Sequence, residues 1–172
     1  MQMLAQWLNG LGLGPWVANS QWVWPICEIF HFIGMAMLMG AIGLMDLRLL
    51  GVGKGLPIAK LEALAPIGVA GFVINFATGV IFVAGNPVGG PIDYLQNLSF
   101  QIKMALILLA GLNVAAFYLT GVARAARALG PMDDAPPAAK AIAAASLFFW
   151  FAVIFFGRLI MYNDTLLIVL GM

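Results

Sequence analysis

The chain has 172 residues, of which 63% are hydrophobic and only 9% are charged, and its mean hydropathy is +1.02. Soluble globular domains carry about 25% charged residues, so this composition excludes an ordinary soluble domain. A net charge of +1 provides no basic face, and we therefore expect no nucleic-acid partner. Cys27 is the only cysteine, which excludes an internal disulfide.

Residues 1–20 precede the first long apolar stretch and are too polar to cross a membrane. Leu4, Trp7, Leu8 and Leu11 recur at helical spacing, with glutamine and asparagine on the other side. This pattern predicts a short N-terminal amphipathic helix in the membrane interface. A frayed terminus is the alternative.

Four apolar stretches follow, at about residues 23–50, 61–84, 98–122 and 141–162. Each is long enough to cross a hydrocarbon core of about 30 Å as a helix. Lipid offers no partner for backbone N–H and C=O groups, so spans of this length must be helical. Residues 21–172 are therefore predicted to form an all-α integral membrane bundle of four transmembrane helices.

Basic residues are concentrated around the first and third connections between these spans. The six residues are Arg48, Lys54, Lys60, Arg124, Arg127 and Lys140. The positive-inside rule places both connections in the cytoplasm, and the third, residues 124–140, is expected to be a solvated linker. We therefore expect a multi-pass protein of the bacterial inner (cytoplasmic) membrane with both termini facing outward.

Four ionisable residues lie within the apolar stretches, all in the outer half of the membrane in this orientation: Glu28, His31, Lys103 and Arg158. Such residues are costly in lipid and usually face the bundle interior. Glu28, His31 and Met35 are spaced by three and four residues, so they form one stripe along the first helix. Cys27 lies one turn before His31.

This cluster favours a membrane redox protein that binds haem b near its outer surface. A b-type haem needs an axial imidazole, which His31 can provide, and partners for two propionates, for which Lys103, Arg158 and Tyr162 are candidates. A quinone or a periplasmic redox protein would be the electron-transfer partner. The chain has a single histidine, so the sixth ligand would be a methionine, Lys103, water or a group from another subunit.

Two alternatives remain open. Cys27, His31 and Met35, with Glu28 beside them, are a soft set of ligands that suits copper. Alternatively, Glu28 could pair with Lys103 or Arg158 while His31 bonds to a neighbouring helix, as in an accessory subunit without enzymatic activity. The chain lacks a Walker loop, a nucleotide fingerprint and a Gly-x-Ser-x-Gly motif, so any oxidoreductase activity would depend on a cofactor.

Three features resemble small four-span bacterial inner-membrane proteins: Glu28-Ile-Phe-His31 in the first span, Ala77-Thr78-Gly79 in the second, and Lys103 at the start of the third. The layout is similar to four-helix haem-handling and copper-resistance membrane families, including a protoporphyrinogen oxidase type. Those families commonly carry histidine on more than one helix, whereas this chain does not. The resemblance therefore implies only His31 as a candidate ligand.

Small residues form grooves on the first two predicted helices. They are Gly34, Ala36, Gly40 and Gly43 on the first helix and Gly68, Gly71 and Gly79 on the second. Such residues allow close approach of helices in membranes. We expect them to mediate self-association into a homo-oligomer.

Overall fold

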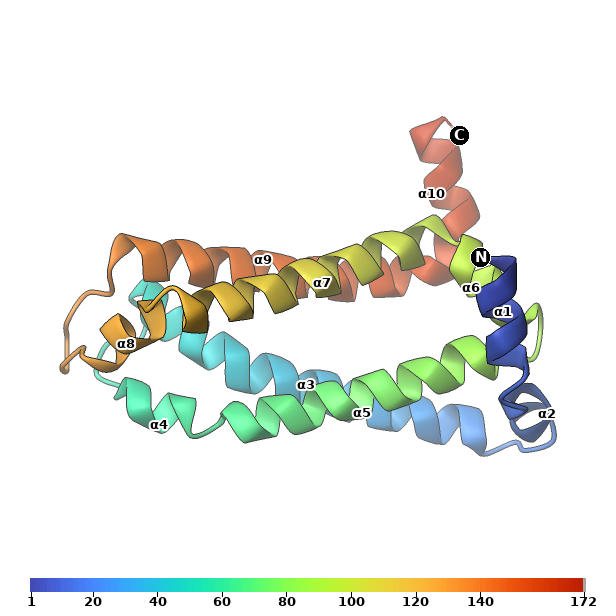
Figure 1. Ribbon diagram of the computed structural model, residues 1–172, viewed down its shortest axis with the longest axis horizontal. Helices are drawn as coiled ribbons and strands as arrows, with labels where there is room; N and C mark the ends of the chain where they lie inside the picture. The colour runs from blue at the N-terminus through green and yellow to red at the C-terminus, as the bar shows by residue number, and fades with distance from the viewer. Residues whose placement is uncertain (172) are drawn as a thin grey trace.

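The computed structural model describes residues 1–171, which form helices joined by short connections with no strand among them. Four helical segments are long and apolar enough to cross a membrane: Val23–Leu50, Ile58–Ala84, Leu98–Leu119 and Pro137–Leu170. Their long helices, α3, α5, α7 and α9, lie side by side in an elongated bundle (Figure 1). The predicted all-α bundle of four membrane-spanning helices is confirmed.

The first two spans differ in how closely they match their predicted boundaries. Helix α3 (Val23–Leu50) coincides with the first predicted span and ends at Gly51, whose left-handed backbone (φ 105°) closes the last turn. The second span is divided into α4 (Ile58–Glu62) and α5 (Ala65–Ala84), so the predicted start at residue 61 falls inside α4. Pro66 lies in the first turn of α5, where its missing N–H is tolerated.

The last two spans have shifted boundaries. Helix α7 (Leu98–Leu119) begins at Asn97, whose side chain accepts a hydrogen bond from the Phe100 N–H. It ends before the predicted residue 122 because Gly121 adopts a left-handed conformation that starts α8 (Val122–Arg127). Helix α9 (Pro137–Leu159) begins before the predicted residue 141.

The chain after α9 turns away from the bundle. A 3-10 turn, η1 (Ile160–Tyr162), leads into α10 (Asn163–Leu170), which projects from the bundle in Figure 1. No separate helix was predicted for this segment. Ile168 and Val169 of α10 are both 77% exposed.

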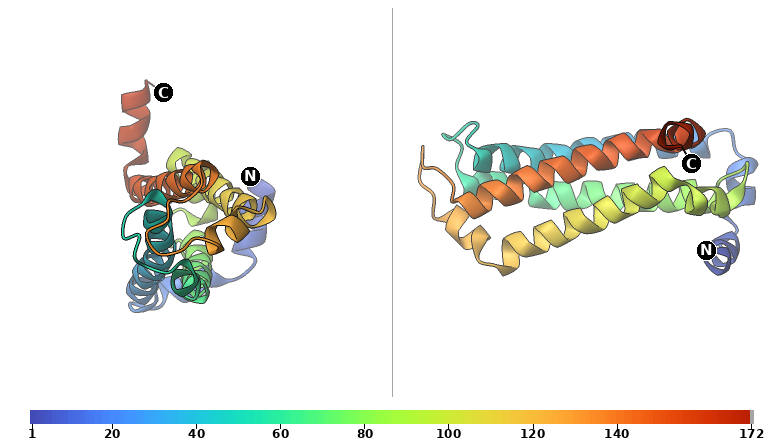
Figure 2. Two further views of the ribbon diagram at one scale, coloured as in Figure 1. Left: turned by 90° about the vertical axis from the view of Figure 1, so that its left-hand side faces the viewer. Right: turned by 90° about the horizontal axis from the view of Figure 1, so that it is seen from above.

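The long helices of the bundle pack against one another in three pairwise contacts (Figure 2). Helix α3 packs against both α5 and α9, and α7 packs against α9. Within residues 1–171, α5 and α7 are not a packed pair. The side of the bundle between α5 and α7 is therefore not closed by direct helix packing.

The α3–α5 contact uses glycines that the sequence suggested for self-association. A Cβ at Gly71 would lie 2.5 Å from the Gly34 carbonyl oxygen and 2.8 Å from the Leu38 backbone nitrogen. Gly34 and Gly71 thus bring two helices of the same chain together, and Gly68 faces Ala41 in the same contact. Gly40 and Gly79 take no part in this contact and have open space around them.

The two ends of the bundle differ in character. We call the end that carries the α3–α4 and α8–α9 connections the basic end, and the end that carries the N-terminus the terminal end. At the terminal end, α1 (Gln2–Asn9) packs on α6 (Gly90–Gln96) and α5, while α2 (Leu13–Ala18) contacts α5. The predicted single N-terminal helix is therefore two short helices, with Leu8 and Val17 buried against the bundle.

Candidate functional site

His31 joins α3 to α5 near the terminal end. Its Nδ1 lies 2.7 Å from the Thr78 hydroxyl oxygen. That hydroxyl has one hydrogen, which it donates to the Ile74 carbonyl at 2.8 Å. His31 Nδ1–H is consequently the donor to Thr78, and in the neutral imidazole this tautomer leaves a lone pair on Nε2.

Two aromatic side chains lie in a row beside this histidine. The Phe82 ring centroid lies 5.3 Å from that of His31 and 5.0 Å from that of Trp24. Trp24 Nε1–H in turn donates to the Glu28 carboxylate at 3.2 Å. Thr78 and Phe82 are one turn apart on the second span, so their shared face was visible in the sequence, but nothing there showed that it meets His31.

Glu28 and Arg158 are not in the bundle interior, contrary to expectation. Both are exposed, and the Arg158 guanidinium lies over the Tyr162 ring at 5.6 Å from its centroid. Glu28 lies near the start of α3, and Arg158 is the penultimate residue of α9. At such positions a long side chain can reach the polar interface, so an exposed location is tolerated.

Lys103 of α7 is half-buried against α9. A Cβ at Gly157 would lie 3.6 Å from the Lys103 ammonium nitrogen, so the lysine side chain lies directly over this glycine of α9. Lys103 is also close enough to act electrostatically on His31. The expected pairing of Glu28 with Lys103 or Arg158 does not occur among the ion pairs of residues 1–171.

The candidate copper ligands do not come together as a compact group. Cys27 is buried, Met35 is half-buried and Glu28 is exposed, although all three lie on α3 with His31. Among residues 1–171, no group of three or more His, Cys, Asp or Glu side chains is placed to hold a metal ion. A copper site here would need methionine ligands or another subunit.

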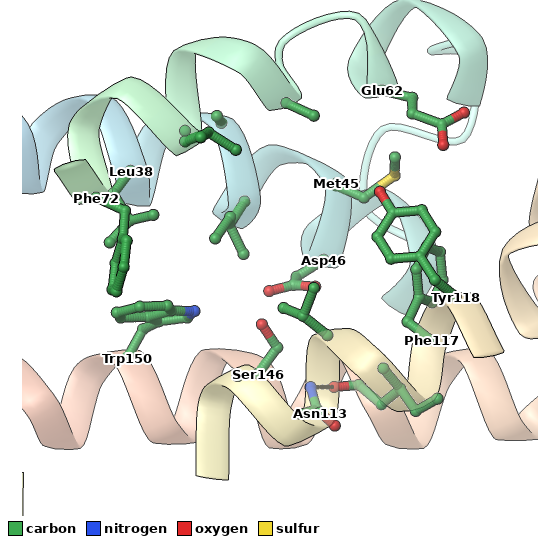
Figure 3. Close-up of a pocket in the computed structure, with 18 of the residues that line it drawn as sticks. Leu38, Met45, Asp46, Glu62, Phe72, Asn113, Phe117, Tyr118, Ser146 and Trp150 are labelled. Atoms are coloured by element: carbon green, nitrogen blue, oxygen red, sulfur yellow. Dashed lines mark hydrogen bonds between the residues drawn. The ribbon is translucent and has the colours of Figure 1, made fainter. Parts of the chain in front are cut away.

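A second polar cluster, which the sequence did not reveal, lies nearer the basic end. Asp46 of α3, Ser146 of α9 and Trp150 of α9 are all more than nine-tenths buried. They border a cavity of about 370 Å³ among α3, α5, α7 and α9 (Figure 3). Ser146 and Trp150 are four residues apart, a spacing that places them on one face of a helix, but nothing in the sequence places Asp46 beside them.

Arg48 forms hydrogen bonds to both connections of the basic end. It is 1% exposed and donates to the backbone carbonyls of Leu56, at 3.0 Å, and of Gly130 and Asp133, both at 3.4 Å. Residues 124–140, predicted to be a solvated linker, are therefore held against the first connection by hydrogen bonds.

Ion pairs also stabilise the contact between the first and third connections. Lys54 lies 2.8 Å and Lys140 3.3 Å from the Asp134 carboxylate. Their hydrogen bonds and positive charges hold the pKa of Asp134 below its usual range. Asp134 therefore stays ionised and paired at neutral pH.

Comparison with known proteins finds no matching family model, no matching curated protein and no matching solved structure.

Proposed function

We propose that this chain is a membrane redox protein that binds haem b through His31. The observation that supports the proposal is the hydrogen bond from His31 Nδ1 to Thr78, which in a neutral imidazole leaves the Nε2 lone pair for a ligand bond. A ligating histidine commonly donates its second N–H to an oxygen acceptor, because that bond fixes the tautomer and the ring orientation. For His31 the Thr78 hydroxyl is this acceptor.

Further support comes from the side chains around His31. Phe82 and Trp24 provide aromatic surface of the kind that packs against a porphyrin. Lys103 lies at the same end of the bundle and would pair with one propionate. Arg158 and Tyr162 are exposed near the end of α9, where a second propionate would reach the interface. Bound haem would supply one-electron redox chemistry.

We propose in addition that the terminal end faces outward from a bacterial inner membrane. Six of the eight lysine and arginine residues belong to the basic end, and this distribution favours a cytoplasmic location for it. The redox partner would then be a quinone or a periplasmic protein. Gly40 and Gly79, with open space around them, are the contacts we assign to a homo-oligomer.

One observation favours a second candidate, an accessory subunit of a membrane assembly. The same His31–Thr78 hydrogen bond links α3 to α5 and satisfies one imidazole nitrogen without any cofactor. Hydrogen bonds between membrane helices stabilise a bundle by roughly 0.6 kcal/mol on average. In that case His31 would contribute to stability alone.

Haem content separates the two candidates. A pyridine haemochrome assay and elemental analysis are applied to the detergent-purified protein and to its His31→Ala, Thr78→Val, Lys103→Ala and Arg158→Ala variants. We expect His31→Ala to lose haem completely. Thr78→Val should keep haem with a shifted midpoint potential, because it removes the hydrogen-bond acceptor and preserves the side-chain shape. Lys103→Ala and Arg158→Ala should weaken haem retention.

Two results would reject the haem proposal. One is full haem occupancy in the His31→Ala variant, and the other is a wild-type protein that carries copper and no haem. If the wild type binds neither, and His31→Ala and Thr78→Val lower its thermal stability equally, the accessory role is favoured.

A further inference from the structure

The cavity among α3, α5, α7 and α9, here called the lateral cavity, opens toward the side of the bundle. Val69 and Phe72 of α5 and Val114 and Tyr118 of α7 line it, and all four side chains are exposed. Helices α5 and α7 do not pack directly on this side. A molecule dissolved in the bilayer could therefore enter between them.

Three side chains with polar groups lie on the inner wall of the otherwise apolar lateral cavity. Asp46 is 6%, Ser146 4% and Trp150 7% exposed. In Figure 3 the Asp46 carboxyl, the Ser146 hydroxyl and the nitrogen edge of Trp150 face the same part of the cavity. Neither Asp46 Oδ2 nor Trp150 Nε1 has a hydrogen-bond partner among residues 1–171.

These two unpartnered atoms limit the chemistry of the ligand. Buried polar groups are almost always hydrogen-bonded, so two polar atoms left together in an apolar cavity indicate a missing partner. Trp150 Nε1–H can only donate and the ionised Asp46 carboxylate can only accept, and a hydroxyl group can serve both at once. An acyl chain offers neither function, and a charged headgroup would remain at the membrane surface.

We propose that the lateral cavity binds a lipid-soluble quinol, with one ring hydroxyl donating to Asp46 Oδ2 and accepting from Trp150 Nε1–H. The cavity volume of about 370 Å³ is within the range of small-molecule sites, and its remaining walls are largely apolar side chains that suit the ring and its tail. Asp46 follows His31 by 15 residues along α3, or roughly 22 Å of helix. This site is therefore separate from the haem site.

The test measures quinol binding to the protein in phosphatidylcholine nanodiscs under anaerobic conditions. The probe is decylubiquinol, and its dimethyl ether is the matched ligand that keeps the shape but lacks both hydroxyl donors. Isothermal titration, with empty nanodiscs as the blank, gives the affinity of each. We expect saturable binding of the quinol and binding of the ether that is weaker by about tenfold, because Asp46 is then left without a donor.

Two matched pairs of variants locate the site. Trp150→Phe removes the indole N–H and should weaken quinol binding about fivefold. Trp24→Phe removes an indole N–H near the terminal end of the bundle, away from the lateral cavity, and should not change quinol binding. Gly111 lines the cavity and has open space around it, so Gly111→Leu should block binding. Gly55→Leu also adds a leucine at an open position, but in the first connection and outside the cavity, and should bind normally.

The result is separable from the haem proposal. His31→Ala should bind the quinol as the wild type does, whatever its haem content. Equal affinity for the quinol and its ether, unchanged binding in both Trp150→Phe and Gly111→Leu, or heat no greater than that of empty nanodiscs would each overturn the assignment.

Discussion

Arg48 is the most deeply buried charged side chain among the described residues, and its partners are backbone carbonyls instead of a carboxylate. Three carbonyls, from Leu56, Gly130 and Asp133, surround a guanidinium that is 1% exposed. The rigid planar arrangement of donors in arginine suits several fixed acceptors at once. At this position a cation therefore acts as a structural connection between two loops.

We expect Arg48→Lys to destabilise the protein by about 2 kcal/mol. A lysine keeps the charge, but its single ammonium group cannot reach three separate carbonyls, so buried acceptors lose their donors. Thermal unfolding in mild detergent, followed by circular dichroism, measures the loss. Arg124→Lys, at an exposed position of α8, is the control. Equal stability of the two variants would show that the carbonyl contacts of Arg48 contribute nothing.

At the scale of helices, the close contact of α3 with α5 depends on two glycines that face each other. Gly34 and Gly71 leave no room for a Cβ, since each would meet backbone atoms of the other helix within 3 Å. The same contact positions Thr78 opposite His31. Helix spacing and the geometry of the candidate haem site are therefore coupled.

Gly71→Ala should separate α3 from α5 and destabilise the bundle by roughly 1–3 kcal/mol, the usual cost of adding a methyl group where there is no space. Gly111→Ala, at a position of α7 with open space around it, should leave stability nearly unchanged. Both variants can be compared by thermal unfolding in the same detergent. A smaller loss for Gly71→Ala than for Gly111→Ala would contradict the close packing of α3 against α5.

At the scale of the whole molecule, charge is divided between the two ends. The basic end holds six of the eight lysine and arginine residues, and the other two, Lys103 and Arg158, lie toward the terminal end. The two candidate sites follow the same division, with His31 toward the terminal end and Asp46 toward the basic end. Orientation in the membrane consequently determines which side of the membrane each site serves.

Alkaline phosphatase fusions test that orientation. The enzyme is active only outside the cytoplasm, so a fusion after Pro91 should be active and a fusion after Asp134 inactive. Immunoblots of the two fusions control for expression. Activity confined to the Asp134 fusion would reverse the orientation and place His31 on the cytoplasmic side.

The spans and the excess of charge at one end could be predicted from the sequence because both follow from local properties. Apolar runs of sufficient length must become helices in lipid whatever they pack against. The helix boundaries differ from the predicted ones where glycine or proline changes the backbone over one or two residues, as at Gly121 and Pro66. Glycine and proline are visible in the sequence, but whether they end a helix there depends on the conformation of the neighbouring turns.

The composition of the sites was decided by the tertiary structure alone. These helices are apolar on nearly every side, so no polar stripe identifies the face that packs inward. Glu28 consequently proved exposed, whereas Asp46 is buried beside Ser146 and Trp150, which lie about 100 residues further along the chain. Close packing through Gly34 and Gly71 brings His31 to Thr78, and the absence of α5–α7 packing leaves the lateral cavity open. Both outcomes depend on how the helices are rotated and paired, which is a property of the whole bundle.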